Sequence, residues 1–265
     1  THPGETPTSF QYEGAIEKLL SDDEVISEYR KKIVFHTVPF TNPDGVYYGR
    51  SRTNYDGVDV ESNWNKDETG TTQEVKLLKQ RMTQVNNSKV MSVFQNIHSQ
   101  ASPSCTFWIH TASSTSDYFY RRQLQFCNLN TSNNSYFPPS DYSFSNLSMT
   151  FPEGWLWSNH GDKVLALTYE TPYDYYSNGN LVTIDNLKWL GEKLVYSIAE
   201  FLEISHPKYL ILDNKDLVTN WQKDSSGVQF FGRDYLSTYY ANNFGNAVFE
   251  TPQIQNGNYE VFGWW

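Results

Sequence analysis

The alternation of apolar strands with amphipathic helices over the first 204 residues is the feature that most constrains the fold. Continuous apolar character, rich in β-branched and aromatic residues, predicts three buried strands at residues 31–40, 105–113 and 163–171. Apolar residues at helical spacing predict three helices at residues 8–30, 71–85 and 183–204. Strands that alternate with helices in this way predict an α/β domain, in which helices cover the sheet.

The sequence changes character near residues 205–208, which read SHPK. The segments that follow are short aromatic and β-branched runs divided by Asn, Gly and Pro, and none has a helical period. We therefore expect two domains, an α/β domain at residues 1–204 and an all-β module at residues 208–265. The module ends on the strand-like run VFGWW, so we expect it to be incomplete.

The charge of the chain excludes two classes of partner. A formal net charge of −10 and a pI of about 5.0 argue against binding to nucleic acid or to an anionic membrane. No uninterrupted apolar stretch approaches the ~20 residues that a membrane helix needs. Asn, Ser, Tyr and Trp are abundant and Lys is scarce, a composition that favours an exported protein, periplasmic or extracellular. Cys105 and Cys127 either form a disulfide or remain buried thiols, and the sequence leaves both open.

Residues of metal-ligand type lie at the edges of the predicted elements. His2 and Glu5 precede the first helix, and His110 closes the strand at 105–113, where a loop begins. Ligand-binding groups collect at the carboxyl ends of strands in open α/β sheets. Two histidines and one carboxylate, with a fourth position left to water, form a known catalytic zinc set. Glu170, close to the end of the strand at 163–171, could take the proton of that water.

On spacing alone, these residues have a second interpretation. His2 and Glu5 could be ordinary polar residues in a turn at a helix entry, and His110 could be hydrogen-bonded in the core. His98 lies in a helix-like stretch without other ligand-type residues beside it, so it is not among the candidates.

The order of four segments resembles one known family. HPGETPTSF is followed by VPFTNPDGVYYGRSRTNYDGVDVESNW, which includes a strong turn and a long loop without helical period, and then by FWIHTASS and LTYET. Together they resemble the zinc carboxypeptidase family, the funnelins, and within it the branch of cytosolic and bacterial carboxypeptidases with an HPGE motif. The resemblance covers about residues 1–204 and implies a mixed twisted sheet flanked by helices, with zinc as cofactor. The first strands of that fold are expected before HPGE, and the sequence begins without them.

The resemblance also implies roles for individual residues. His2, Glu5 and His110 match the three zinc ligands of the family, and Glu170 matches its general base and acid. Arg52 matches the arginine that polarises the scissile carbonyl and stabilises the oxyanion, with Arg50 as the alternative.

The sequence departs from the family where the end of the substrate is recognised. The family's Asn-Arg pair falls on Glu61 and Ser62, followed by Asn63, in DVESNW. An arginine binds a carboxylate through two hydrogen bonds, whereas a glutamate repels it and favours an amine or a hydroxyl. The family's mobile active-site tyrosine has no clear match, although Tyr142 and Tyr173 are near in sequence.

Two functions follow from these matches. The first is zinc-dependent hydrolysis of a peptide or peptide-like amide with an unusual end group, such as a cell-wall peptide or a modified side chain. The alternative is a catalytically inactive, carboxypeptidase-like binding module for cell-wall or glycan ligands, but retention of the whole water-activating set speaks against it. The segments after residue 208 are similar to the start of bacterial β-sandwich modules, which adds an expected contact with carbohydrate or cell wall.

Overall fold

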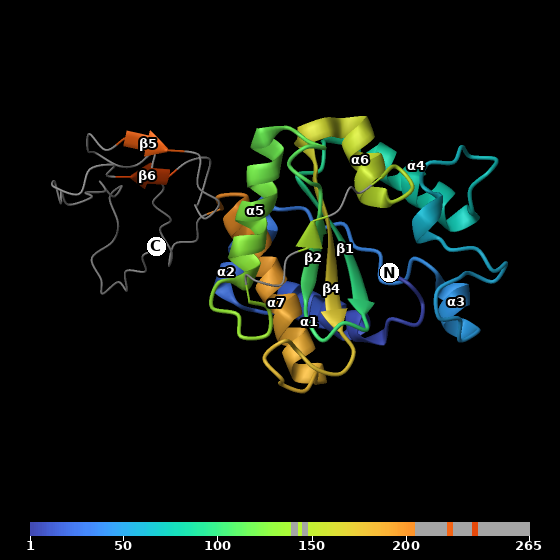
Figure 1. Ribbon diagram of the computed structural model, residues 1–265, viewed down its shortest axis with the longest axis horizontal. Helices are drawn as coiled ribbons and strands as arrows, with labels where there is room; N and C mark the ends of the chain where they lie inside the picture. The colour runs from blue at the N-terminus through green and yellow to red at the C-terminus, as the bar shows by residue number, and fades with distance from the viewer. Residues whose placement is uncertain (139–142, 145–147, 205–221, 225–234, 238–265) are drawn as a thin grey trace.

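The computed structural model describes residues 1–138, 143–144, 148–204, 222–224 and 235–237. Helices α1 to α4 follow the opening turn, strands β1 and β2 come next, and helices then alternate with strands from α5 to α7 (Figure 1). The helices are α1 (Thr6–Leu20), α2 (Glu24–Lys32), α3 (Pro43–Tyr47), α4 (Gln73–Ser88), α5 (Asp117–Thr131), α6 (Pro152–His160) and α7 (Ile184–Phe201), with short 3-10 turns η1 (Glu61–Asn63) and η3 (Gly161–Lys163). The strands are β1 (Val93–Gln100), β2 (Thr106–Ile109), β3 (Ser143–Phe144), β4 (Leu165–Pro172), β5 (Gln222–Asp224) and β6 (Tyr235–Ser237).

The central sheet is mixed, in the order β1-β4-β2-β3. Strand β1 is parallel to β4, whereas β2 runs antiparallel to β4. Residue His98 is in register with Glu170 on the first pair, and Thr106 is in register with the same Glu170 on the second. The start of β2, not its end, therefore lies beside Glu170.

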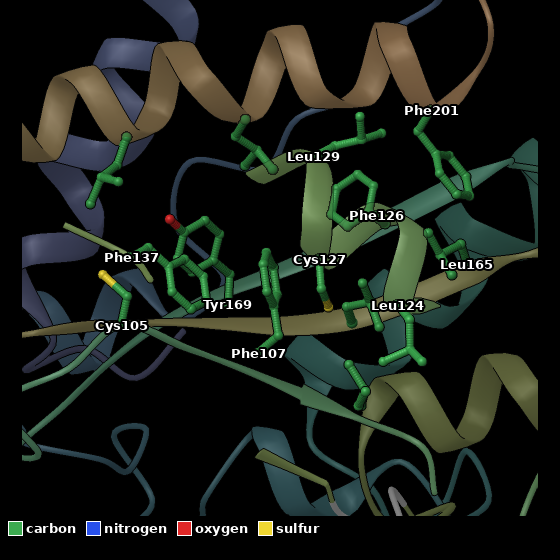
Figure 2. Packing of buried hydrophobic residues seen from close by; sticks show 14 of the residues in the cluster. Cys105, Phe107, Leu124, Phe126, Cys127, Leu129, Phe137, Leu165, Tyr169 and Phe201 are labelled. Carbon is green, nitrogen blue, oxygen red and sulfur yellow. The ribbon is translucent and has the colours of Figure 1, made fainter. Parts of the chain in front are cut away.

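The main hydrophobic core lies between the sheet and helices α5 and α7 (Figure 2). Phe107 and Tyr169 from the strands pack against Phe126 and Phe137, and all four side chains are buried. Large aromatic side chains supply most of the apolar area that such a core removes from water. The expected mixed sheet flanked by helices is confirmed.

Both cysteines belong to this core. Cys105 and Cys127 are fully buried and are not joined by a disulfide. Of the two alternatives that the sequence leaves open, the structure has buried thiols.

Helices α1 and α7 approach each other closely because glycines face each other at their crossing. A Cβ atom on Gly14 would lie 2.2 Å from the Lys188 carbonyl oxygen, and one on Gly191 would lie 1.9 Å from the Gln11 carbonyl oxygen. Any larger residue at either position would push the helices apart. This contact fixes α1, and with it the turn at residues 1–5 that precedes α1.

Several predicted elements have different bounds in the structure, and one is wrong. The single helix at 8–30 is two helices, because Ser21 ends α1 in an extended conformation and Asp23 caps α2. The apolar run at 31–40 is not a strand. It is largely exposed, with Val34 79% accessible, and no strand of the described residues pairs with it. Apolar β-branched residues make a buried strand only when a neighbouring strand satisfies their backbone.

The predicted boundary at 205–208 and most of the predicted C-terminal module lie outside the described residues. Within them, β5 and β6 form an antiparallel pair. None of the described helices combines the length and the apolar character that crossing a membrane requires.

Candidate metal centre

The turn at residues 1–5 places His2 and Glu5 side by side. The Glu5 amide donates to the His2 carbonyl, and the Glu5 carbonyl accepts from the hydroxyl of Thr8 in the first turn of α1. The intervening Gly4 packs on the loop at 42–66, since its amide donates to the Ser51 carbonyl at 3.0 Å and a Cβ there would clash with that oxygen. The HPGE motif is thus a tight turn held between α1 and the long loop.

Strands β1 and β4 add a row of polar side chains beside this turn. Asn96 and His98 alternate with Ile97 on β1, so both side chains point to the same face of the sheet. Their partners in register are Thr168 and Glu170 on β4. At this point one face of the sheet is therefore polar, and the opposite face packs into the main core.

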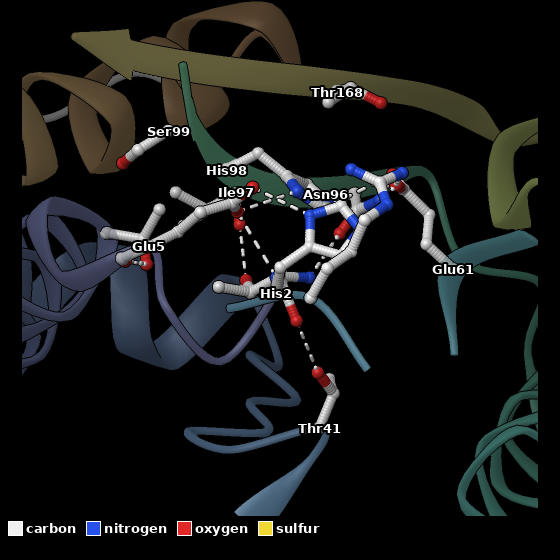
Figure 3. A network of polar contacts seen from close by, with 12 residues as sticks. His2, Glu5, Thr41, Glu61, Asn96, Ile97, His98, Ser99 and Thr168 are labelled. Carbon is white, nitrogen blue, oxygen red and sulfur yellow. Dashed lines mark hydrogen bonds and ion pairs between the residues drawn. The ribbon is translucent and has the colours of Figure 1, made fainter. Parts of the chain in front are cut away.

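Two imidazoles lie between two carboxylates at the centre of the site (Figure 3). On one side, Glu5 places one oxygen 2.6 Å from His2 Nδ1 and the other 2.8 Å from His98 Nδ1. On the other side, Glu61 places its two oxygens 3.0 Å from His2 Nε2 and 3.1 Å from His98 Nε2. The two rings meet edge to face with centroids 4.7 Å apart. Each carboxylate therefore contacts both histidines.

Glu61 is held in this position by three further groups. Arg52 donates to Asp59 at 2.7 Å and to Glu61 at 3.4 Å. The Glu61 amide donates to Asp59 at 2.9 Å, and Asn96 donates to the other Glu61 oxygen at 3.5 Å. Asp59 itself lies 3.5 Å from His2 Nε2. The loop at 42–66 thus delivers an arginine and two acids to the outer side of the histidines.

The electrostatics of the centre follow from this clustering. Burial lowers the pKa of His2, but hydrogen bonds to Asp59, Glu5 and Glu61 outweigh burial and raise it to about 10. Burial raises the pKa of Glu5, yet the histidines lower it to about 2. For Glu61 the same balance of burial against the charges of His98 and His2 leaves the pKa well below its usual range. In the metal-free centre His2 is therefore cationic and Glu5 anionic at neutral pH.

Glu170 differs from the other acids of the site. Burial raises its pKa to about 7, with the nearby positive charge of His98 opposing and the negative charges of Glu5 and Glu61 adding to the rise. Its Oε2 atom is buried and makes no hydrogen bond within the described part of the chain. A carboxyl group with a pKa near 7 can both accept and donate a proton at physiological pH. The pKa of Tyr173 is raised by burial and by Glu5 and Glu170, so its phenol lies within electrostatic reach of them.

The donor set fits a metal ion. His2 Nε2 and His98 Nε2 are buried, and despite their closeness to Glu61 neither makes a hydrogen bond of acceptable geometry among the described residues. Ligand atoms of His2, Glu61 and His98 lie within 4.8 Å of one another. Imidazole nitrogens with carboxylate oxygens are ligands that zinc prefers. A buried group of this kind is satisfied by a cation and costly without one.

The structure does not bring His110 to this centre. Because β2 is antiparallel to β4, its carboxyl end lies at the opposite end of the sheet from Glu170. There His110 packs against Phe119 and Trp157 and lines a separate cavity of about 260 Å³. Burial lowers its pKa to about 4. His98 occupies the place beside His2 and Glu5 that the sequence assigned to His110.

The sequence does not single out His98, because the stretch around it resembles a helix. The run Val93–Gln100 has two polar residues alternating with Ile97, which is a half-buried strand pattern with a polar face. That alternation is the signal that could have found it. The remaining predicted residues lie close by: Arg52 and Glu61 touch the centre, and Asn63 is buried and donates to the Asp59 backbone carbonyl.

The comparison with protein families decides what kind of centre this is. The zinc carboxypeptidase family model matches residues 1–227. The chain belongs to the zinc carboxypeptidase family. This family consists of zinc-dependent carboxypeptidases, and the imidazole and carboxylate groups of the centre are of the type that zinc binds.

Individual relatives match shorter stretches. Cytosolic carboxypeptidase 6 of Mus musculus is 43% identical over 63 residues, which are 24% of this chain and 12% of the relative. Cytosolic carboxypeptidase 6 of Caenorhabditis elegans is 34% identical over 108 residues, 39% of this chain and 23% of the relative. The chain thus spans less than a quarter of the length of these curated relatives.

Solved structures share the fold at low identity. The metallo-carboxypeptidase of Burkholderia cenocepacia superposes with a TM-score of 0.63 at 20% identity, over 76% of this chain and 55% of that one. A metallo-carboxypeptidase of Pseudomonas aeruginosa, in complex with (2-guanidinoethylmercapto)succinic acid, gives 0.61 at 20% identity, over 77% and 55%. The carboxypeptidase fold of the described domain agrees with the family match.

Proposed function

We propose that the chain hydrolyses a peptide or peptide-like amide with zinc held by His2, Glu5 and His98 and with Glu170 as general base. The observation that carries the proposal is the convergence of His2, Glu5 and His98, with Glu170 in register with His98 on the adjacent parallel strand. The HPGE turn and strand β1 are far apart in sequence, so their meeting at one buried point is a built feature of the fold.

Zinc, when bound, supplies Lewis acidity that polarises a carbonyl and acidifies water. Glu170 takes the proton of the attacking water and returns it to the departing amine, a role that suits a carboxyl group whose pKa is near 7. Arg52 lies on the loop at the rim of the centre with 54% of its side chain exposed, so its guanidinium can also reach a substrate oxygen.

This chain departs from the family pattern at the position expected to bind the end of the substrate. Ser62 stands where the family resemblance expects the arginine that binds a terminal carboxylate. A serine hydroxyl gives at most a neutral hydrogen bond in place of a bidentate ion pair. We therefore expect a weak preference for a free peptide C-terminus. Ser62→Arg should raise kcat/KM for free-carboxylate peptides relative to their C-terminal amides, and an unchanged ratio would contradict the expectation.

The alternative remains an inactive binding module. Its support is that Arg52 is engaged by Asp59 and Glu61 and that the arginine at position 62 is lost. Zinc content of the purified protein, followed by turnover of a peptide library with Glu170→Gln as control, separates the two functions. Stoichiometric zinc with Glu170-dependent turnover supports the hydrolase. Zinc-free protein, or zinc-loaded protein whose turnover does not depend on Glu170, contradicts it.

A further inference from the structure

The position of Glu61 carries an inference beyond the proposed function, on which it rests. We propose that Glu61 is a positioning residue of the zinc centre, which holds both histidine ligands from behind, and not a residue that recognises the end of the substrate. In the family resemblance this position is an asparagine, so the role belongs to this chain.

The Glu61 carboxylate points toward the histidines. Its two oxygens face His2 Nε2 and His98 Nε2 at 3.0 and 3.1 Å, so one side chain contacts both rings at once (Figure 3). Its side chain is only 15% exposed. A residue that selects a substrate end group has to present its charge to that group, whereas Glu61 presents its charge to the histidines.

A neutral imidazole has one nitrogen with a lone pair and one nitrogen with an N–H group. Both Nδ1 atoms face Glu5, the carboxylate of the HxxE motif. If the lone pairs at Nδ1 bind the metal beside Glu5, the N–H groups at Nε2 are left on the side of Glu61, whose oxygens lie 3.0 and 3.1 Å away. Those hydrogen bonds are not formed in the metal-free arrangement, and a small turn of each ring would form them. A carboxylate that accepts the outer N–H of a ligating histidine fixes the orientation of the ring and raises its basicity.

Neighbouring residues also hold the Glu61 side chain in place. Arg52 and Asn96 each donate to one of its oxygens, and its own amide is bonded to Asp59. These contacts come from the loop and from β1, the strand that carries His98. An asparagine here could not serve both rings as an acceptor, because it has one carbonyl oxygen and no charge.

The test is the zinc affinity of the metal-free protein, measured by competition with a chromophoric chelator. Glu61→Gln and Glu61→Asn should weaken zinc binding by about 10–100-fold, the range for outer carboxylates of metal-binding histidines. Glu61→Asp, which keeps the charge, should recover part of the loss. Glu74→Gln is the matched control, because it removes a half-buried carboxylate that is bonded to Asn54 and not to the histidines.

A second readout separates positioning from general damage to the fold. In the cobalt-substituted protein, Glu61→Gln should shift the d–d absorption bands, and Glu74→Gln should leave them unchanged. Unfolding of the metal-free variants by urea shows whether each is folded. If Glu61→Gln does not fold, Glu61→Asp and Glu61→Asn carry the test.

The outcomes distinguish this inference from the proposed function. If the wild-type protein did not bind zinc stoichiometrically, both the proposed function and the role of Glu61 would be overturned. Wild-type binding that His98→Ala abolishes, with Glu61 variants unaffected, would overturn the role of Glu61 alone. A loss in Glu61→Gln as large as in Glu5→Gln would make Glu61 a direct ligand and would also overturn the positioning role.

Discussion

The sheet carries two buried histidine environments, one at each end of strand β4, and they behave in opposite ways. His98 and His2 lie among Glu5, Glu61 and Asp59, where hydrogen bonds and negative charge raise the pKa of each histidine against the effect of burial. His110 packs against the rings of Phe119 and Trp157, where burial outweighs a hydrogen bond to the Glu153 backbone and lowers its pKa to about 4. Burial alone therefore does not make a histidine a ligand. What distinguishes the His2 and His98 environment is its acidic neighbours, which stabilise a positive charge beside the imidazoles.

The largest expected difference between the two environments is in metal binding. His98→Ala should abolish stoichiometric zinc binding, because it removes one of the two imidazoles that the centre offers. His110→Ala should leave the zinc affinity within about twofold, since its cavity holds no carboxylate ligand of the described part of the chain. Zinc content after gel filtration measures both. If His110→Ala lost zinc and His98→Ala retained it, the zinc site would lie at His110 and not at His98.

Catalysis should depend on Glu170, which lies at the same end of the sheet as His98. Glu170→Gln should lower kcat by about 10²–10⁴-fold, the usual contribution of a general base, while zinc binding changes little. In the wild type, kcat/KM should fall as the pH drops below about 7, because protonated Glu170 cannot accept a proton. Peptide hydrolysis across pH 5–9 provides the measurement. Full activity in Glu170→Gln would remove this residue from the mechanism.

Proton release should accompany zinc binding at the carboxylate-rich end. The pKa of His2 is raised to about 10 in the metal-free protein, so His2 is protonated at pH 7 and must lose that proton to bind a metal. Zinc affinity should then rise with pH, by about tenfold per pH unit for one released proton. Calorimetry in buffers of different ionisation enthalpy counts the protons. A pH-independent affinity between pH 6.5 and 8.5 would contradict the clustering described above.

The smallest expected effect concerns the stability of the metal-free protein. The pKa of His110 is lowered from 6.5 to about 4, so the unfolded state binds the extra proton between these values and stability falls as the pH drops through them. His2 has the opposite sign, since its raised pKa gives stability below pH 6.5 that is lost as the pH rises toward 10. Urea unfolding of His110→Gln should show less acid sensitivity than the wild type between pH 6.5 and 4.5. Identical acid sensitivity would mean that His110 is not buried in a neutral form.

The sequence predicts the fold class and two of the three proposed zinc ligands, and the reasons for the limit are physical. His2 and Glu5 are three residues apart in one turn, so local spacing places them together. His98 reaches them only through the pairing of β1 with β4, which a single sequence does not reveal. The prediction of His110 assumes that the strands of an α/β domain end on the same side of the sheet. Because β2 is antiparallel to β4, its carboxyl end lies at the other end of the sheet.

For the loop at 42–66, the sequence likewise predicts the segment but not the contacts of its side chains. Its length and its NPDG turn predict a functional loop, and the structure brings Arg52, Asp59 and Glu61 from it to the histidines. The replacement of the Asn-Arg pair by Glu61 and Ser62 is visible in the sequence. The direction of the Glu61 side chain is not, because it depends on Asn96 and on the long-range approach of β1.

The most direct test of the account is the position of zinc in crystals of the zinc-loaded protein, located by anomalous scattering at the zinc edge. The account predicts one peak within bonding distance, ~2 Å, of His2, Glu5 and His98, with Glu61 beyond the ligands. A peak at His110, or no peak between the histidines of the HPGE turn and β1, would contradict it.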